Sequence, residues 1–293
     1  MPRGVPKAGY RMTAAAIARQ GNGQQLLQKV VPMQVVQNET DAEIEARLAE
    51  RFTILEELTN AAIKGHARAL IVSGPAGLGK SFTVEQALEA WDPESENHTI
   101  VKGYVRPTGL YRLLYQHRMR NQVIVFDDAD AIFYDDVSLN LLKAVCDTTD
   151  RRIVSYMTEK IMVDEDEAVN IPKSFEFKGT IIFITNLDFD QMIEKGHKAS
   201  THMQALVSRS HYIDLQMKTR RDYMVRIKQV VKMGLLTNQG LDQEQQDDVL
   251  AFLDKNAEKL RELSLRIAIK VGAIRKLNKA NWMAVAKATC CKV

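Results

Sequence analysis

The sequence predicts an α/β protein in which helices cover both faces of a parallel sheet, followed by a small all-helical domain. A glycine-rich segment, Gly74–Ser81, follows a short apolar run and precedes a helix-like stretch. Further short apolar runs recur along the chain and end in polar or acidic residues, as the strands of a buried parallel sheet do. Beyond about Met217 the apolar spacing is helical as far as Lys287. Together these patterns predict a three-layer αβα core with a helical domain after it.

Three regions are expected from the change of composition along the chain. Residues 1–38 contain Gly, Pro, Gln and several cations but no acid, which predicts a basic, partly disordered arm. Residues 39–216 are expected to form the α/β core, and residues 217–293 a helical lid domain with a basic C-terminal end. Within the core, Asp41–Lys64 carries an apolar stripe at helical spacing, so we expect a helix that leads into the first strand.

The remaining elements of the core follow from local patterns. Strands are expected where apolar residues cluster, at Ala69–Val72, Thr99–Val105, Val123–Phe126, Thr180–Asn186 and Tyr212–Leu215. Helices are expected to begin at Phe82, Pro107 and Ser138. A β-hairpin is expected over residues 152–177, with the acidic run Asp164–Glu167 between its strands.

The segment Gly74–Ser81 matches the phosphate-binding pattern G-x-x-x-x-G-K-[ST] at every fixed position, and we call it the P-loop. Backbone N–H groups of such a loop surround an anion, and glycine allows the close approach of a phosphate. Lys80 is expected to reach the β- and γ-phosphates of ATP, and the Ser81 hydroxyl to ligate Mg²⁺. The residues expected to bind the nucleotide are Gly74, Pro75, Ala76, Gly77, Leu78, Gly79, Lys80, Ser81 and Phe82.

Acidic residues follow the apolar run Val123–Phe126. The carboxyl ends of parallel strands face the ligand crevice, so these acids are expected beside the phosphates. Asp127 is expected to hold Mg²⁺, directly or through water, and Asp128 to activate the attacking water. Asp130 is the alternative base, and an acidic turn without a catalytic role is the simpler alternative.

The order of these elements resembles that of the AAA+ ATPases over roughly residues 41–280, with the P-loop and the acidic strand end as the strongest matches. The resemblance implies a P-loop NTPase core with a helical lid. It implies that Asn186 is the first sensor, which positions the lytic water, and that Arg209 is an arginine finger for a neighbouring subunit. It implies that Arg266 is the second sensor in the lid. It also implies a homo-oligomer, often a ring of six, with ATP at each interface. A weaker likeness is to AAA+ proteins carried by tailed phages.

Each of these three assignments has an alternative. Asn186 would also suit a polar cap at the end of a strand, and Arg209 a surface salt bridge, with Arg152 as a rival finger. Arg266 stands four positions after Glu262, a spacing that favours an ion pair on a helix. One departure concerns Asp128, because many AAA+ proteins have glutamate there. Aspartate is one methylene shorter, so we expect hydrolysis, but slow hydrolysis.

The partner is expected to be DNA. The segment Val105–Gly109, where protein-threading relatives carry an aromatic loop, holds a cation and no aromatic residue, with Tyr104 assigned to the preceding strand. The basic ends of the chain also favour a polyanion. We therefore expect an ATPase of DNA replication, recombination or repair. The alternative is a chaperone-like ATPase of the MoxR or activase type with a protein client, and a further alternative is an ATP-regulated switch.

The bulk properties exclude several other classes of protein. No apolar run approaches the ~20 residues of a membrane span, so no membrane partner is expected. The N-terminus lacks the apolar core of a signal peptide, and the 3 cysteines have neither disulfide nor metal-ligand spacing. These features predict a cytoplasmic protein, in the host cytoplasm if a phage encodes it.

Overall fold

The computed structural model describes residues 39–158, 162–164, 169–217, 219–277 and 280–292. The basic arm expected over residues 1–38 lies outside the described residues, and so do Glu165–Glu167 of the acidic run.

A five-stranded parallel sheet forms the core, with the strand order β2-β3-β8-β1-β9. The strands are β1 (Ala69–Ser73), β2 (His98–Lys102), β3 (Val123–Asp127), β8 (Thr180–Thr185) and β9 (His211–Asp214). Every residue of β1, β3 and β8 is buried. Such strands read as continuous apolar runs, which explains why the sequence pattern located them.

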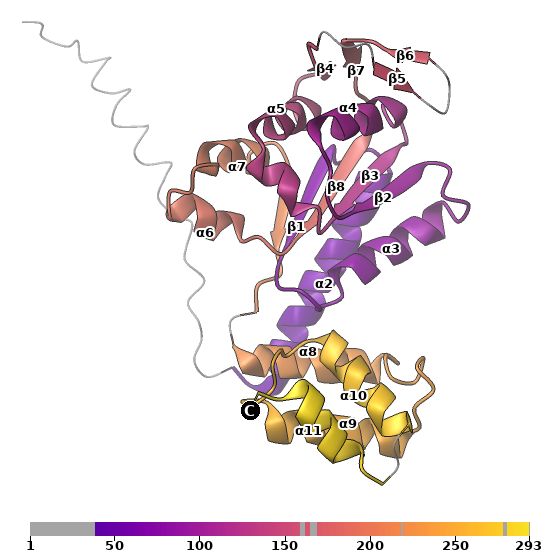
Figure 1. The fold of residues 1–293 in the computed structure, drawn as a ribbon, viewed down its shortest axis with the longest axis vertical. Helices are drawn as coiled ribbons and strands as arrows, with labels where there is room; N and C mark the ends of the chain where they lie inside the picture. Colours follow the sequence, from indigo (N-terminus) through magenta and orange to yellow (C-terminus); the bar gives the residue numbers. More distant parts are fainter. Residues whose placement is uncertain (1–38, 159–161, 165–168, 218, 278–279, 293) are drawn as a thin grey trace, which may run out of the picture. The chain divides into compact units, whose positions relative to one another are not determined.

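Helices cover both faces of the sheet, as Figure 1 shows. One face packs on α2 (Asp41–Ile63) and α3 (Lys80–Trp91), in a cluster that includes Leu70, Val72 and Val125. Successive side chains of a strand point to opposite faces of the sheet. The strand residues between those of the first cluster, such as Ile71, Ile124 and Phe126, therefore pack on the other face. The helices of that face are α4 (Pro107–Gln116), α5 (Asp136–Val145), α6 (Phe189–Glu194) and α7 (Ser200–Val207), and the 3₁₀ helix η1 (Asp130–Tyr134) also packs there.

The first helix of the core begins where its sequence predicts. The Thr40 hydroxyl accepts from the backbone N–H of Glu43, and the Glu43 carboxylate accepts from the backbone N–H of Thr40 at 2.7 Å. This reciprocal capping box satisfies backbone donors that a helix start leaves open.

The expected extent of the second strand is wrong. Strand β2 ends at Lys102, and Gly103 adopts a φ of 95°, a conformation that ends the extended backbone. Tyr104 therefore lies in the loop between β2 and α4, where the residue is 74% exposed. The Tyr104 ring is thus an exposed aromatic group of this loop and not a residue of the strand.

The expected hairpin is present and has more strands than expected. Strands β4 (Ile153–Ser155) and β7 (Ser174–Glu176) pair antiparallel, and β5 (Met162–Asp164) and β6 (Val169–Ile171) form a second antiparallel pair. The Tyr111 hydroxyl of α4 donates to the carbonyl of Pro172 at 2.8 Å. The same ring lies 5.1 Å from the ring of Phe175, so aromatic packing holds the base of the hairpin on α4.

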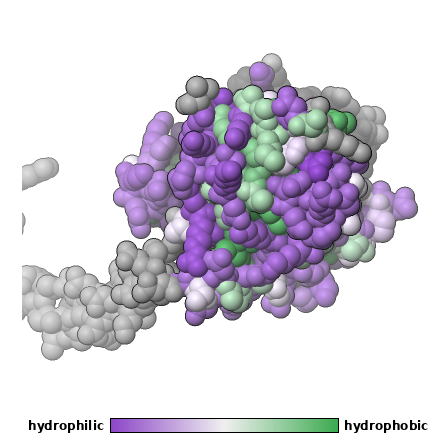
Figure 2. Space-filling model, turned by 90° about the horizontal axis from the view of Figure 1, so that it is seen from below, coloured by the Kyte–Doolittle hydropathy of each residue, from purple (hydrophilic) through white to green (hydrophobic). Residues whose placement is uncertain are grey.

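Helices after the core form the predicted lid around a hydrophobic cluster of their own. They are α8 (Arg220–Lys232), α9 (Gln243–Asn256), α10 (Leu265–Leu277) and α11 (Trp282–Cys290). Figure 2 views the molecule from the end where these helices lie in Figure 1, and a band of hydrophobic residues crosses that otherwise hydrophilic face. The three-layer αβα fold with a helical lid is therefore confirmed. None of the described helices has the length and apolar character needed to cross a membrane.

We predict that Phe183→Ala lowers the free energy of unfolding by about 3–5 kcal/mol, because the substitution leaves a cavity in a dense core. Phe183 is fully buried on β8, with its ring 5.6 Å from that of Phe126 and 5.5 Å from that of Phe133. Urea denaturation measures the loss. The matched control is Tyr104→Ala, which removes an exposed aromatic ring and should change the free energy of unfolding by less than about 0.5 kcal/mol. Equal losses in the two variants would contradict the assignment of the core.

Candidate active site

The P-loop forms the turn between β1 and α3. Gly77 and Gly79 have φ values of 75° and 97°, in the left-handed region that favours glycine. Gly79 is also the N-cap of α3, and no side chain among the described residues caps this helix start. The first backbone N–H groups of α3 are therefore open to an anion, at the positive end of the helix dipole.

Lys80 points back into the P-loop and is only 5% exposed. Its ammonium donates to the carbonyl of Gly74, to the carbonyl of Pro75 at 2.9 Å and to Asn186 Oδ1 at 3.0 Å. Burial lowers the pKa of Lys80 to about 8, although the nearby Asp128 and Asp127 oppose this shift. A desolvated cation held by neutral oxygens suits an incoming phosphate, which would offer it a full negative charge.

Asp127 and Ser81 meet at the edge of the sheet. The Ser81 hydroxyl donates to Asp127 Oδ1 at 2.8 Å, and Asp127 is 5% exposed. The other carboxylate oxygen, Oδ2, lies 3.2 Å from the ammonium of Lys102, which also donates to Glu85 at 2.7 Å. Sequence reasoning missed Lys102. Lys102 is the last residue of β2, and its register partner on β3 is Asp127. A lysine at the end of the strand that neighbours an acid-terminated strand is the sequence signal that could have identified Lys102.

Asn186 links Lys80 to the second acid. Its amide group donates to Asp128 Oδ1 at 2.7 Å while its Oδ1 accepts from Lys80. Asp128 is exposed and has a φ of 53°, a conformation in which aspartate is several-fold enriched. Its carboxylate is thus accessible from solvent beside the P-loop lysine.

Asp130, the alternative base, is placed differently. It accepts from the Thr185 hydroxyl at 2.6 Å, and burial raises its pKa. Its carboxylate is therefore engaged within the chain. Thr185, the last residue of β8, was not among the expected site residues.

The lid contacts the P-loop directly. The backbone N–H of Leu265 donates to the carbonyl of Gly77 at 2.8 Å, so the start of α10 lies on the loop. Arg266 is exposed in the first turn of α10, and its positive charge is close enough to lower the pKa of Lys80. Glu262 pairs with Lys270 at 3.7 Å, and no pair with Arg266 occurs among the described contacts.

A second lid arginine approaches the P-loop and was missed from the sequence. Arg226 of α8 is 7% exposed, and its guanidinium lies over the ring of Phe52 at 3.4 Å. A Cβ built on Gly79 would lie 3.8 Å from Arg226 Nη2. Burial lowers the pKa of Arg226 to about 10. Its helical context resembles an ordinary core position, so the sequence holds no signal for it.

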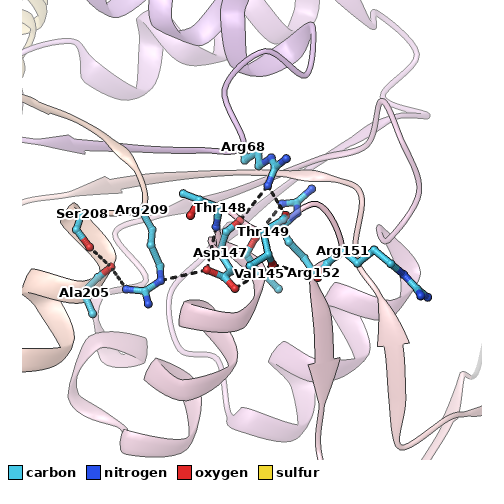
Figure 3. A network of polar contacts seen from close by, with 10 residues as sticks. All are labelled: Arg68, Val145, Asp147, Thr148, Thr149, Arg151, Arg152, Ala205, Ser208 and Arg209. Carbon is cyan, nitrogen blue, oxygen red and sulfur yellow. Dashed lines mark hydrogen bonds and ion pairs between the residues drawn. The ribbon is translucent and has the colours of Figure 1, made fainter.

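Arg209 lies at the opposite end of the sheet from the P-loop. It precedes β9, whose His211 is paired with Leu70 near the start of β1, whereas the P-loop follows the end of β1. The Arg209 guanidinium donates to the carbonyl of Ala205 at 2.8 Å and lies 3.6 Å from Asp147, as Figure 3 shows. Its side chain is 34% exposed, so it remains accessible at this edge.

Arg152, the rival finger, is held inside the chain. It is 7% exposed and donates to the carbonyls of Val145 at 2.8 Å and Gly179 at 2.9 Å. A guanidinium held in this way does not project from the chain, as a finger for a neighbouring subunit must.

The residues at the P-loop fit Mg²⁺ with a polyphosphate. One hydroxyl and one carboxylate, Ser81 Oγ and Asp127 Oδ1, are 2.8 Å apart at the loop. Mg²⁺ is commonly held by one or two protein oxygens together with phosphates and waters. The open N–H groups of α3 and the buried Lys80 supply the matching positive environment.

Comparison with known proteins gives one sequence relative and several structures. The chain is 36% identical over 250 residues to the "uncharacterized 36.7 kDa protein in nrdC-mobD intergenic region" of Enterobacteria phage T4, covering 85% of this chain and 76% of the relative. A search of protein-family models finds no match. Domain III of the replication initiation protein DnaA from Thermotoga maritima aligns with a TM-score of 0.48 and 14% identity, covering 84% of this chain and 92% of that one. A RuvB mutant from Thermotoga maritima aligns with a TM-score of 0.46 and 13% identity, covering 83% and 68%.

We predict that Gly77→Ala weakens the binding of Mg·ATP at least tenfold and destabilises the protein more than Gly65→Ala does. Both glycines have positive φ, at 75° and 73°, so alanine is strained at each by about 1 kcal/mol or more. Only at Gly77 would the new Cβ also meet another atom, Ser264 Cβ at 2.7 Å, whereas nothing lies within 4 Å at Gly65.

Isothermal titration with nucleotide and urea denaturation measure the two effects. If Gly77→Ala matches Gly65→Ala in both measurements, the contact between lid and P-loop is not as described.

Proposed function

We propose an ATPase function for this chain, which belongs to the same family as the uncharacterized 36.7 kDa protein in the nrdC-mobD intergenic region of Enterobacteria phage T4. The observation that carries the proposal is the convergence of Lys80, Ser81 and Asp127 at the start of α3. A buried ammonium, a hydroxyl and a carboxylate at a glycine loop form the group that Mg·ATP requires.

The chemistry follows from the charges that these residues supply. Ser81 and Asp127 would hold Mg²⁺, which would supply positive charge beside the phosphate oxygens. Lys80 stabilises the negative charge that spreads over the transferred phosphoryl group. Asp128, exposed and bonded to the Asn186 amide, accepts the proton of the attacking water, while Asn186 fixes the orientation of that carboxylate.

Activity is proposed to depend on assembly of a homo-oligomer, as in ring-shaped AAA+ ATPases. The five residues of β1 span about 16 Å at ~3.3 Å per residue, so a chain cannot bring its own Arg209 to its own P-loop. The half-exposed Arg209 is instead proposed to contact the nucleotide of a neighbour. A finger supplied in this way is worth roughly 10³–10⁵ in rate in related NTPases. Arg266 at the start of α10 is proposed to contact the phosphates from the lid of the same chain.

The proposed setting is DNA replication, recombination or repair, supported by the excess of basic residues in 266–293. The test measures the ATPase rate with and without single- and double-stranded DNA at two salt concentrations. Stimulation that fades with salt supports the DNA role. Stimulation by a protein partner alone supports a remodelling role, and tight ATP binding with negligible turnover supports a switch.

One observation favours a protein client as the second candidate function. Tyr104 is 74% exposed in the loop after β2, where AAA+ proteins that thread polypeptides carry an aromatic residue. Tyr104→Ala that abolishes stimulation by a protein partner, with no change in the basal ATPase rate, would favour this candidate over the DNA role.

We predict that Arg209→Ala retains the affinity for Mg·ATP and loses most turnover, by at least about a hundredfold. The control is Arg151→Ala, which removes an arginine with a 76% exposed side chain from the same edge. The sharper test mixes two inactive variants, Arg209→Ala and Lys80→Ala. Because some interfaces in the mixture pair an intact P-loop with an intact Arg209, activity should return. A mixture that stays inactive, or an Arg209→Ala enzyme at the wild-type rate, would contradict the role in trans.

We predict that Asp128→Asn lowers the maximal ATPase rate by about 10²–10⁴, with little change in nucleotide affinity. Asp130→Asn should lower the rate by less than about tenfold, because the Asp130 carboxylate is already engaged by Thr185. Steady-state kinetics and nucleotide titration separate the two effects. The reverse ranking of the two variants would assign the base to Asp130.

A further inference from the structure

A cavity lies at the end of the sheet where the parallel strands begin. It has a volume of about 410 Å³ and is assembled from the end of α2, the segments that precede β1, β3 and β8, and the base of the hairpin. The P-loop is at the opposite end of β1, so the two sites share no residue. A water molecule occupies about 30 Å³ in the liquid. The cavity volume of about 410 Å³ is more than ten times as large, so the cavity has room for more than one phosphate group.

The lining of this cavity is strongly basic. Its charged residues are Lys64, Arg68, Arg120, Arg152 and Lys178, against Asp150 and Glu176. Glu176 is already neutralised, because Lys178 lies 3.1 Å and Arg151 3.7 Å from its carboxylate, and these cations lower its pKa. Five cations against two acids leave the lining with an excess of three positive charges, to which Arg151 beside Glu176 adds one more.

Two arginines of this cavity hold main-chain carbonyls. Arg68 donates to the carbonyls of Asp147 at 3.3 Å and Thr149 at 2.6 Å, and Arg152 to those of Val145 and Gly179. Figure 3 shows the two guanidinium groups side by side above this segment. Among the described residues, neither has a carboxylate within ion-pair distance. Burial lowers the pKa of Arg152 to about 10, and repulsion from the nearby charge of Arg68 adds to this effect.

The cavity is suited to charge and not to aromatic bases. Its aromatic residue, Phe177, is 1% exposed, and the Arg152 guanidinium lies 5.1 Å from the centre of its ring. No stacking surface for a base is therefore offered by this residue. Guanidinium and ammonium groups together bind phosphate oxygens well, the first through paired donors and the second as a point charge.

We propose that this cavity is a second anion site, which binds adjacent phosphate groups of a single-stranded nucleic acid or of a free polyphosphate. In its nucleic-acid form the inference rests on the proposed role in DNA metabolism, for which it supplies a contact site. It does not rest on ATP hydrolysis, because no lining residue belongs to the P-loop.

The test removes two exposed cations of the lining, Lys64→Gln with Arg120→Gln. Neither side chain is buried, so the fold should be kept, which circular dichroism and the melting temperature check. The matched control is Lys255→Gln with Arg261→Gln, an exposed lysine and arginine of the lid. The probe is a fluorescein-labelled 20-mer of deoxythymidylate, titrated by fluorescence anisotropy at several salt concentrations.

The lining variant should bind the probe about tenfold more weakly at low salt, and the control within about twofold of wild type. The slope of log K against log salt should fall by about 1.4 in the lining variant, at ~0.7 for each phosphate of a single strand that the protein no longer neutralises. Equal affinity and slope in wild type and the lining variant would overturn the proposal.

Two further arms identify the ligand and the site. Inorganic tripolyphosphate titrated calorimetrically into Lys80→Ala protein, whose P-loop is impaired, tests the free polyphosphate. One outcome is that tripolyphosphate binds, that the oligonucleotide does not, and that the lining variant loses the binding of tripolyphosphate. This outcome would support the cavity as an anion site and refute its nucleic-acid form. Oligonucleotide binding that disappears in Lys80→Ala protein would assign the probe to the P-loop and overturn the proposal.

Discussion

The structure depends on the parallel pairing of β1, β3 and β8, which are buried along their whole length. Their register aligns the ends of the strands, so that Ser73, Asp127 and Thr185 come to one edge of the sheet. Burial on both faces permits only apolar side chains within these strands, and polar groups can appear only where the strands end. The position of the candidate active site is thus a consequence of how the core packs.

At this edge the chain holds a costly arrangement of charges. The ammonium of Lys80 is buried and donates to two carbonyl oxygens and to the amide oxygen of Asn186. The carboxylates of Asp127, Asp128 and Asp130 lie near it. Removal of the ammonium from water accounts for its lowered pKa. The oxygens that accept from Lys80 are neutral, so a negatively charged phosphate would be a stronger partner for its ammonium. This preference agrees with the ATPase function that we propose.

The two ends of the sheet carry opposite kinds of site. The carboxyl ends of the strands hold the acids and the P-loop lysine, and the amino ends hold Arg68, Arg152 and Arg209. A single chain cannot bring these two ends together, because the length of the strands separates them. Association of chains end to end would do so, which is the physical basis of the proposed trans arrangement.

Much of the fold could be predicted because its signals are local. The apolar runs of the sheet, the helical stripe of Asp41–Lys64 and the hairpin are all visible within short windows of sequence. The expected second strand is too long, because the positive φ of Gly103 ends the extended backbone inside the expected range. The additional strands β5 and β6 and the short helices α6 and α7 were missed, since their apolar patterns are brief and depend on tertiary packing for stability.

The sequence by itself determined the P-loop, because its glycines, Lys80 and Ser81 stand at fixed spacing within one turn. It also determined Asp127 and Asn186, because each lies at the polar end of an apolar run. Only the tertiary structure decided that Lys102 neutralises Asp127, that Arg226 reaches the P-loop from the lid, and that distant segments enclose a basic cavity. The physical reason is that these interactions join residues far apart in the chain. Charges separated in sequence become neighbours only when the strands pair and the helices pack.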